Sequence, residues 1–197
     1  MTKANLILAS ASPRRRELLA QAGYIFTVES ADIDESERRN ESPADYVRRL
    51  AEEKAQAVFA RHAPQPDLIV LGADTTVVCE GRILAKPADA ADAKRMLQHL
   101  SGRTHQVLTG IAAVTHAGTS SAVESTDVTF APIPASELDL YCTTCEPLDK
   151  AGAYGIQGYA ARWIPRIDGD YFNVMGLPIA RTVRLIEDAS DTSGERQ

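Results

Sequence analysis

Short apolar runs alternate with amphipathic segments along most of this chain, and this alternation limits the folds that it can adopt. The continuous apolar run at 68–71 is typical of a strand that is buried on both faces of a sheet. Residues 43–59 instead carry apolar side chains at helical spacing, and Ser42 is suited to cap that helix. Such alternation predicts an α/β fold. Two long strand candidates, 104–116 and 121–131, flank a short turn, so we expect a mixed sheet flanked by helices.

The remaining elements follow from the same periodicities. We expect further strands over 6–9, 25–29, 77–79 and 82–84, and further helices from Pro13 to Gly23, from Asp89 to Gly102, near 136–143 and near 178–188. A chain of 197 residues is suited to one domain, which we place at residues 1–188. The polar segment 189–197 is expected to be a disordered tail.

Charge and cysteine content exclude several classes of protein. The net charge of −6 argues against binding to a nucleic-acid polymer or a membrane surface, both of which attract positive charge. No apolar stretch approaches the roughly 20 residues of a membrane span, and the start lacks an apolar signal segment, so we expect a cytoplasmic protein. The three cysteines predict no disulfide framework. Cys142 and Cys145 have the spacing of a zinc or redox pair, but further zinc ligands do not follow them.

Three consecutive arginines, Arg14 to Arg16, stand in the first turn of the helix that Ser12 and Pro13 are expected to begin. Cations are unfavourable there, because the helix dipole already places partial positive charge at that end. A bound oligophosphate would turn this repulsion into shared attraction, since helix amides and guanidinium groups both bind anions. A solvated basic face explains the same pattern equally well.

Three further features are compatible with chemistry, although each has a plainer explanation. Asp74 follows the buried strand 68–71, where a carboxylate can bind a metal ion or take a proton from water, or can simply stabilise a turn. Lys86 ends a hairpin arm, and a lone lysine is most often a surface residue. Residues 149–158 are rich in glycine without the dinucleotide-binding spacing, which suits either a tight connection or close approach to a ligand.

Taken together and in order, the motifs of this chain resemble those of the Maf family of nucleoside triphosphate pyrophosphatases. The segments that carry the resemblance are LASASPRRRELL, DIDE, EKA, GADTTV, KP, LSGRTHQVLTG, TDVTF, EPLDKAGAYGIQG and NVMGLP. They extend from about Leu6 to Ile186. The segment at 149–158 resembles the branch that hydrolyses dTTP and UTP, whereas the branch that acts on 7-methyl-GTP has a different segment there.

The resemblance implies an elongated α/β fold with a mixed sheet and a central nucleotide-binding cleft, an architecture shared with inosine triphosphate pyrophosphatases. It implies hydrolysis between the α and β phosphates, which yields a nucleoside monophosphate and pyrophosphate. It also implies a divalent metal (Mg, Mn or Co) and a homodimer. Two other functions stay open, a 7-methyl-GTP pyrophosphatase and a non-catalytic nucleotide-binding regulator of septum formation.

The resemblance also assigns roles to residues of this chain. It implies substrate binding by Ser10, Arg14 and Arg15, catalysis by Asp74, Glu35, Lys54 and Lys86, metal binding by Asp74 and Glu35, and base selection by Arg14, Thr75 and Gln157. Ala85 departs from the pattern, because many members carry glycine before Lys86. Asp74 is our choice for the general base. Gln157 could instead brace the glycine-rich loop through backbone hydrogen bonds. If Arg15 is a phosphate ligand, Arg15→Lys should lower activity, because lysine keeps the charge but loses the two-pronged guanidinium group. The melting temperature should change little.

Overall fold

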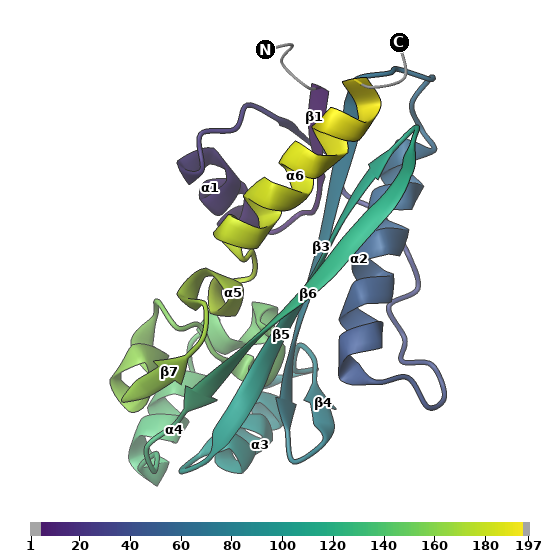
Figure 1. Cartoon of the computed structure of the whole chain (residues 1–197). Coiled ribbons are helices and arrows are strands. Elements are labelled where there is room, and N and C mark those ends of the chain that lie inside the picture. Colours follow the sequence, from purple (N-terminus) through teal and green to yellow (C-terminus); the bar gives the residue numbers. More distant parts are fainter. Residues whose placement is uncertain (1–4, 195–197) are drawn as a thin grey trace. The chain divides into compact units, whose positions relative to one another are not determined.

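The computed structural model describes residues 5–194 of the chain and contains a mixed seven-stranded sheet with helices around it (Figure 1). The strand order is β2-β1-β3-β5-β6-β7, and β4 pairs with β3 outside this path. The parallel pairs of β1 and the antiparallel pairs β3–β4 and β6–β7 make the sheet mixed. The predicted α/β class and mixed sheet are therefore confirmed.

The elements have these bounds. The strands are β1 (Asn5–Ala9), β2 (Thr27–Val28), β3 (Leu68–Cys79), β4 (Arg82–Leu84), β5 (Thr104–Thr115), β6 (Gly118–Thr129) and β7 (Arg166–Asp168). The α-helices are α1 (Pro13–Gln21), α2 (Pro43–Phe59), α3 (Ala90–Leu100), α4 (Ala135–Cys142), α5 (Tyr171–Met175) and α6 (Ile179–Gly194). Three short 3-10 helices follow α4, namely η1 (Glu146–Asp149), η2 (Ala151–Ala153) and η3 (Tyr159–Trp163). Among these helices we find none with both the length and the apolar character that a membrane crossing requires.

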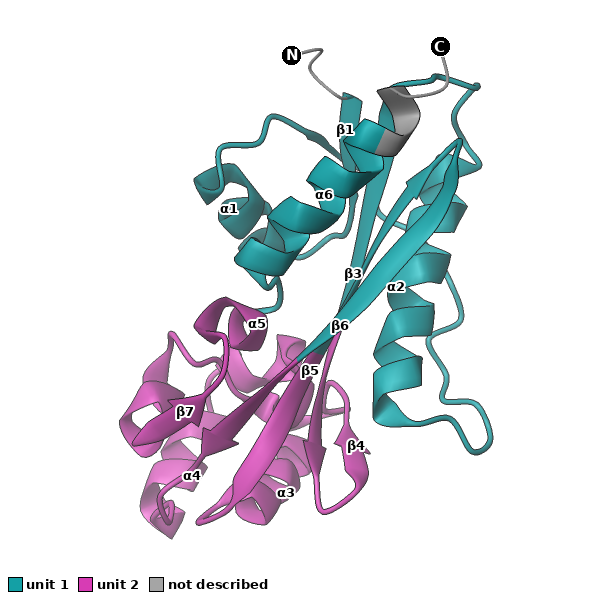
Figure 2. Cartoon of the chain, viewed as in Figure 1, with its two compact units in different colours: residues 1–74, 109–124, 176–197 teal, residues 75–108, 125–175 magenta. Residues whose placement is uncertain are grey.

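The chain divides into two compact units, which we describe separately (Figure 2). Unit 1 comprises residues 1–74, 109–124 and 176–197, and unit 2 comprises residues 75–108 and 125–175. Strands β3, β5 and β6 contribute residues to both units. The boundary on β3 falls between Asp74 and Thr75.

In unit 1, β1 pairs in parallel with β2 on one side and with β3 on the other. Figure 2 shows α2 on one face of these strands and α1 and α6 on the opposite face. The core beneath α2 joins apolar side chains of the helix and the sheet, namely Ile7, Ala9, Ala55, Val58, Leu68, Val70 and Val114. Ser42 caps α2 as predicted, since its hydroxyl accepts a hydrogen bond from the Asp45 amide.

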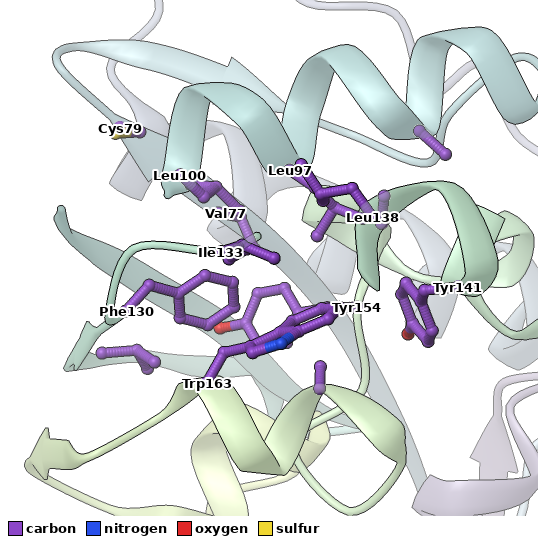
Figure 3. Close-up of a cluster of buried hydrophobic side chains, with 14 of the residues drawn as sticks. Val77, Cys79, Leu97, Leu100, Phe130, Ile133, Leu138, Tyr141, Tyr154 and Trp163 are labelled. Carbon is purple, nitrogen blue, oxygen red and sulfur yellow. The ribbon is translucent and has the colours of Figure 1, made fainter. Parts of the chain in front are cut away.

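In unit 2, aromatic side chains form the centre of the core (Figure 3). The Phe130 ring lies 4.8 Å from the Tyr154 ring and 6.4 Å from the Trp163 ring, in edge-to-face geometry. Leu97 and Leu100 of α3 pack into the same cluster. Tyr154 belongs to the glycine-rich segment 149–158, so this segment is anchored in the core through its aromatic residue.

Several predicted elements differ in extent from the observed ones. The strand predictions at 68–71 and 77–79 are parts of one strand, β3, which passes through Asp74 because this carboxylate is paired inside the fold and does not need a solvated turn. The predicted strand at 25–29 is reduced to Thr27–Val28, with Ile25 largely exposed. The helix predicted near 178–188 continues to Gly194, and 195–197 of the predicted tail lie outside the described residues. The sequence did not predict α5 or β7.

Candidate active site

Arg15, in the first turn of α1, uses its guanidinium group to join three segments of unit 1. Its Nε donates to the Gly176 carbonyl oxygen at 2.8 Å, and its Nη1 donates to the Ala73 carbonyl oxygen at 2.9 Å and to the Ser10 hydroxyl at 3.2 Å. Burial lowers the pKa of Arg15, while the nearby Asp74 and Glu35 carboxylates oppose this shift and Arg14 adds to it. Arg15 therefore lies close to the predicted acidic residues and also ties α1 to β3.

Helix α1 begins at Pro13 as predicted, but the capping interaction expected of Ser12 is absent. The Ser12 side chain makes no capping hydrogen bond, and the Ser12 amide instead donates to the Ser10 hydroxyl at 3.2 Å. The first turn also contains no acidic residue. The start of α1 therefore carries the partial positive charge of the helix dipole without a local side-chain cap to offset it.

Lys54, on α2, bridges the two predicted acidic residues. Its Nζ lies 2.7 Å from Asp74 Oδ1 on β3 and 2.8 Å from Glu35 Oε1 in the loop before α2. Lys54 and Asp74 are only 9% and 8% exposed, whereas the Glu35 side chain is 53% exposed. The low local dielectric strengthens the attraction between Lys54 and Asp74, and the exposed Glu35 leaves this cluster open to solvent on one side.

A glycine on β3 allows Lys54 to reach Asp74. A Cβ atom at Gly72 would overlap the Ala51 carbonyl oxygen of α2 and would lie 2.9 Å from the Ala55 amide nitrogen. Only glycine permits this close approach of helix and strand. Lys54 lies between these two helix positions in the sequence, so the same approach brings its side chain to β3.

Two residues that the sequence analysis missed hold the acidic loop against α2. Tyr46 donates through its hydroxyl to the Glu35 carbonyl oxygen at 2.9 Å, and Arg49 donates to the Ser36 carbonyl oxygen at 3.0 Å. Burial, with added effects of the Asp74 and Glu35 carboxylates, raises the pKa of Tyr46 to about 12, so its hydroxyl remains a donor at neutral pH. Tyr46 is buried on α2 and the Arg49 side chain is only 12% exposed, and no local pattern in the sequence marks either contact.

The other predicted site residues, Thr75, Lys86 and Gln157, belong to unit 2. Lys86 is exposed and follows β4. The neighbouring Ala85 carbonyl oxygen accepts a hydrogen bond from the Gly152 amide at 3.2 Å, which brings the Lys86 segment to the glycine-rich segment. The structure therefore brings the Lys86 segment and the glycine-rich segment together within unit 2. That they form one site with the residues of unit 1 stays a prediction.

Gln157 occupies an exposed position in a turn whose two ends are glycines. The Gly158 amide donates to the Gly155 carbonyl oxygen at 3.0 Å and closes this turn. Among residues 5–194 we find no hydrogen bond from the Gln157 side chain to the rest of the chain. The alternative in which Gln157 braces the loop is therefore not the arrangement observed.

Asp74 and Glu35 are chemically suited to the divalent metal that the resemblance implies. Magnesium is usually held by one or two carboxylates together with substrate phosphates, and not by an all-protein cage. Within the described residues no cluster of three or more His, Cys, Asp or Glu side chains could hold a metal. Asp74 and Glu35, each held by Lys54 through one oxygen, fit a magnesium ion that is bound by two carboxylates and the substrate phosphates.

These observations define an α/β protein whose first unit gathers a buried lysine between two carboxylates, close to an arginine at a helix start. The chain belongs to the family of Maf-like proteins, whose pattern matches residues 5–189.

Relatives of this chain carry a common name. A protein of Symbiobacterium thermophilum named dTTP/UTP pyrophosphatase is 54% identical over 181 residues, which is 92% of each chain. A protein of Hahella chejuensis with the same name is 51% identical and covers 93% of this chain and 91% of its own. The solved structure of the Staphylococcus aureus Ham1 protein aligns with a TM-score of 0.47 and 14% identity, over 64% of this chain and 72% of that one.

Proposed function

We propose that this protein hydrolyses dTTP and UTP between the α and β phosphates and releases a nucleoside monophosphate and pyrophosphate. The names of its relatives and its membership of the Maf-like family support this reaction. The observation that carries the proposal is the contact of Lys54 with both Asp74 and Glu35, close to the Arg15 guanidinium. These are the charges that polyphosphate hydrolysis requires, namely cations for the phosphates and a carboxylate for the attacking water.

Positive charge binds the triphosphate in this proposal. The substrate carries roughly four negative charges, so several cationic groups must share its phosphates. Arg14, Arg15, Lys54 and Lys86 supply these groups, and the uncapped amides at the start of α1 add to them. The Ser10 hydroxyl, which accepts from Arg15, can donate its proton to a phosphate oxygen.

Asp74 acts on the attacking water. Its carboxylate takes a proton from the water as the water oxygen bonds to phosphorus and the bridging P–O bond breaks. Lys54 orients this carboxylate through the 2.7 Å contact. A divalent cation (Mg, Mn or Co), held by Asp74 and Glu35, would offset the phosphate charge when bound.

Base selection falls to Gln157 with Arg14 and Thr75. The Gln157 amide can donate to O4 and accept from N3–H of uracil or thymine, while cytosine offers the opposite pattern. An unsatisfied buried group costs about 1–3 kcal/mol, so UTP and dTTP should exceed CTP by roughly tenfold in kcat/KM. The 5-methyl group of thymine needs only space, so dTTP and UTP should be similar.

A substrate panel with pyrophosphate detection tests this function. We expect pyrophosphate from UTP and dTTP with Mg²⁺, little from CTP or 7-methyl-GTP, and none after chelation of the metal. Gln157→Glu should change the ranking of the bases. Equal losses on every substrate would assign Gln157 a supporting role, and a preference for 7-methyl-GTP would reject the dTTP/UTP branch.

We also propose that residues 1–188 act as a single domain and that the protein is cytoplasmic and homodimeric. The net charge of −6 supports a small-molecule partner over a nucleic-acid polymer or a membrane. The homodimer rests on the family resemblance alone. Sedimentation velocity would test it, since a chain of 21.3 kDa and its dimer differ twofold in mass.

A further inference from the structure

The turn that carries Gln157 is flanked by glycines whose backbone angles do not require glycine. Gly158 has φ of −96° and ψ of −154°, an extended conformation that alanine can adopt. Gly155 is likewise not one of the glycines with a positive φ. The absence of side chains at these two positions therefore needs another explanation.

Glu146, at the start of η1, supplies that explanation at Gly158. A Cβ atom at Gly158 would overlap Glu146 Oε1 and would lie 2.6 Å from the carboxyl carbon. The Glu146 side chain thus occupies the space that a side chain at 158 would fill. At Gly155, a Cβ atom would lie 2.9 Å from Lys150 Cε, and Lys150 Nζ donates to the Glu146 carbonyl oxygen at 2.6 Å. Both ends of the turn therefore rest on the segment 146–150.

The Glu146 carboxylate is itself held in place by two donors. The Tyr141 hydroxyl donates to Oε1 at 3.2 Å, and the Tyr159 amide donates to Oε2 at 3.5 Å. Tyr141 is buried, and its ring stacks on Tyr159 with centroids 5.7 Å apart. Burial and the neighbouring Glu146 raise the pKa of Tyr141, so its hydroxyl stays protonated and able to donate.

A second anchor precedes the turn. Tyr154 shares a 2.8 Å hydrogen bond with His105 Nε2 inside the aromatic core of unit 2. Ile156 is also buried, so the chain enters the turn from fixed positions. The exposed Gln157 is then the side chain of this turn that can reach a ligand, because its neighbours are buried or are glycine.

We propose that Glu146 is a positioning residue, which clamps the turn 155–158 in one conformation and so presents the Gln157 amide to the base before the nucleotide binds. This inference rests on the proposed function, since it assigns Gln157 to base recognition. Fixing the amide in advance avoids the entropy cost of ordering it on binding. The clamp therefore acts on discrimination between bases more than on the hydrolytic step.

Hydrogen exchange of the Gly158 and Tyr159 amides measures the clamp without substrate. Glu146→Ala removes the acceptor of the Tyr159 amide, and we expect exchange at both amides to accelerate about tenfold or more. The intrinsic rates stay the same, because residue 146 is distant from both amides in the sequence. Protected amides in α3 and β5 report whether the variant is folded. Asp139→Ala, which removes an exposed acid of α4 that pairs with Lys94, is the matched control and should leave both rates unchanged.

Gly158→Ala provides an independent variant. The added methyl group displaces the Glu146 carboxylate, so exchange at both amides, taken relative to their intrinsic rates in the new sequence, should accelerate as in Glu146→Ala. In the Glu146→Ala background the methyl group has room, and Gly158→Ala should then add little. Such non-additivity is expected of residues in contact, whereas the effects of distant, independent residues add.

Kinetics on UTP and CTP test the link to base recognition. In Glu146→Ala the preference for UTP over CTP in kcat/KM should fall about fivefold, with kcat for UTP within about twofold of the wild type. Wild-type exchange rates in Glu146→Ala would overturn the clamp, and faster exchange with an unchanged preference would overturn its role in base recognition. If the wild-type protein hydrolyses neither nucleotide, the proposed function fails. The exchange rates alone then show whether Glu146 holds the turn 155–158 in one conformation.

Discussion

Asp74 tests the proposed chemistry at the scale of a single residue. Asp74→Asn keeps the shape of the side chain and leaves an oxygen that can accept from Lys54, but it removes the carboxylate that takes the proton. We expect kcat for UTP to fall about a hundredfold or more, as for loss of a general base. Steady-state kinetics and thermal unfolding would measure this. Asp168→Asn, an exposed acid on β7, is the control, and wild-type turnover by folded Asp74→Asn would rule out the assignment.

Arg15 is the residue for which the structure changes the expectation most. The sequence predicts that Arg15→Lys affects activity and not stability, but the guanidinium donates to two backbone carbonyls and to Ser10. Lysine cannot make these contacts together. We therefore expect Arg15→Lys to lose activity and also about 1–3 kcal/mol of unfolding free energy, since buried carbonyls lose their donors.

Arg16→Lys is the matched control for Arg15→Lys. Arg16 is exposed and stands in the same helical turn, so its replacement by lysine should change neither activity nor the denaturant midpoint. A midpoint in Arg15→Lys equal to that of Arg16→Lys would contradict the structural role of Arg15.

At the scale of elements, the approach of α2 to β3 determines whether Lys54 meets Asp74. Gly72→Ala would place a methyl group against the backbone of α2, which cannot move aside as a flexible side chain can. We expect a loss of about 1–3 kcal/mol or more in unfolding free energy, as for other overpacked sites, together with reduced activity. Urea unfolding and UTP turnover would measure both. Ser120→Ala, an exposed position on β6, is the control, and a Gly72→Ala protein with wild-type stability would contradict this packing.

Local sequence signals predicted most elements but not how far they extend. The Ser42 cap, the start of a helix at Asp89 and the strands at 77–79 and 82–84 are where the sequence places them. Strand β3 was interrupted in the prediction because Asp74 resembles a turn residue. Its charge is compatible with a strand only because Lys54 reaches it from another element.

At the scale of the whole molecule, buried His105 links stability to pH. Burial lowers the pKa of His105 to about 4, below the usual value of 6.5. Between these values the unfolded chain binds a proton that the folded protein does not, so the free energy of unfolding falls as pH falls from about 6.5 to 4. The shifted pKa of His105 changes the free energy of unfolding by about 3 kcal/mol at most over this pH interval.

Equilibrium unfolding of wild type and His105→Gln between pH 4 and 7 would measure this contribution. The variant should show a flatter pH dependence over that interval, whatever its stability at pH 7. Parallel pH profiles for the two proteins would show that His105 is not responsible.

The sequence by itself determined the α/β class, the order of most elements and the family resemblance, because periodicity, caps and motifs are local properties of the chain. The tertiary structure alone decided which charges meet. Lys54 and Asp74 are 20 residues apart, and Glu146 and Tyr159 are 13 apart. The first contact depends on how closely the backbones of α2 and β3 approach at Gly72, and the second on the space that Gly158 leaves for the Glu146 side chain. Close packing of this kind depends on both partners at once, and no local pattern in either segment contains it.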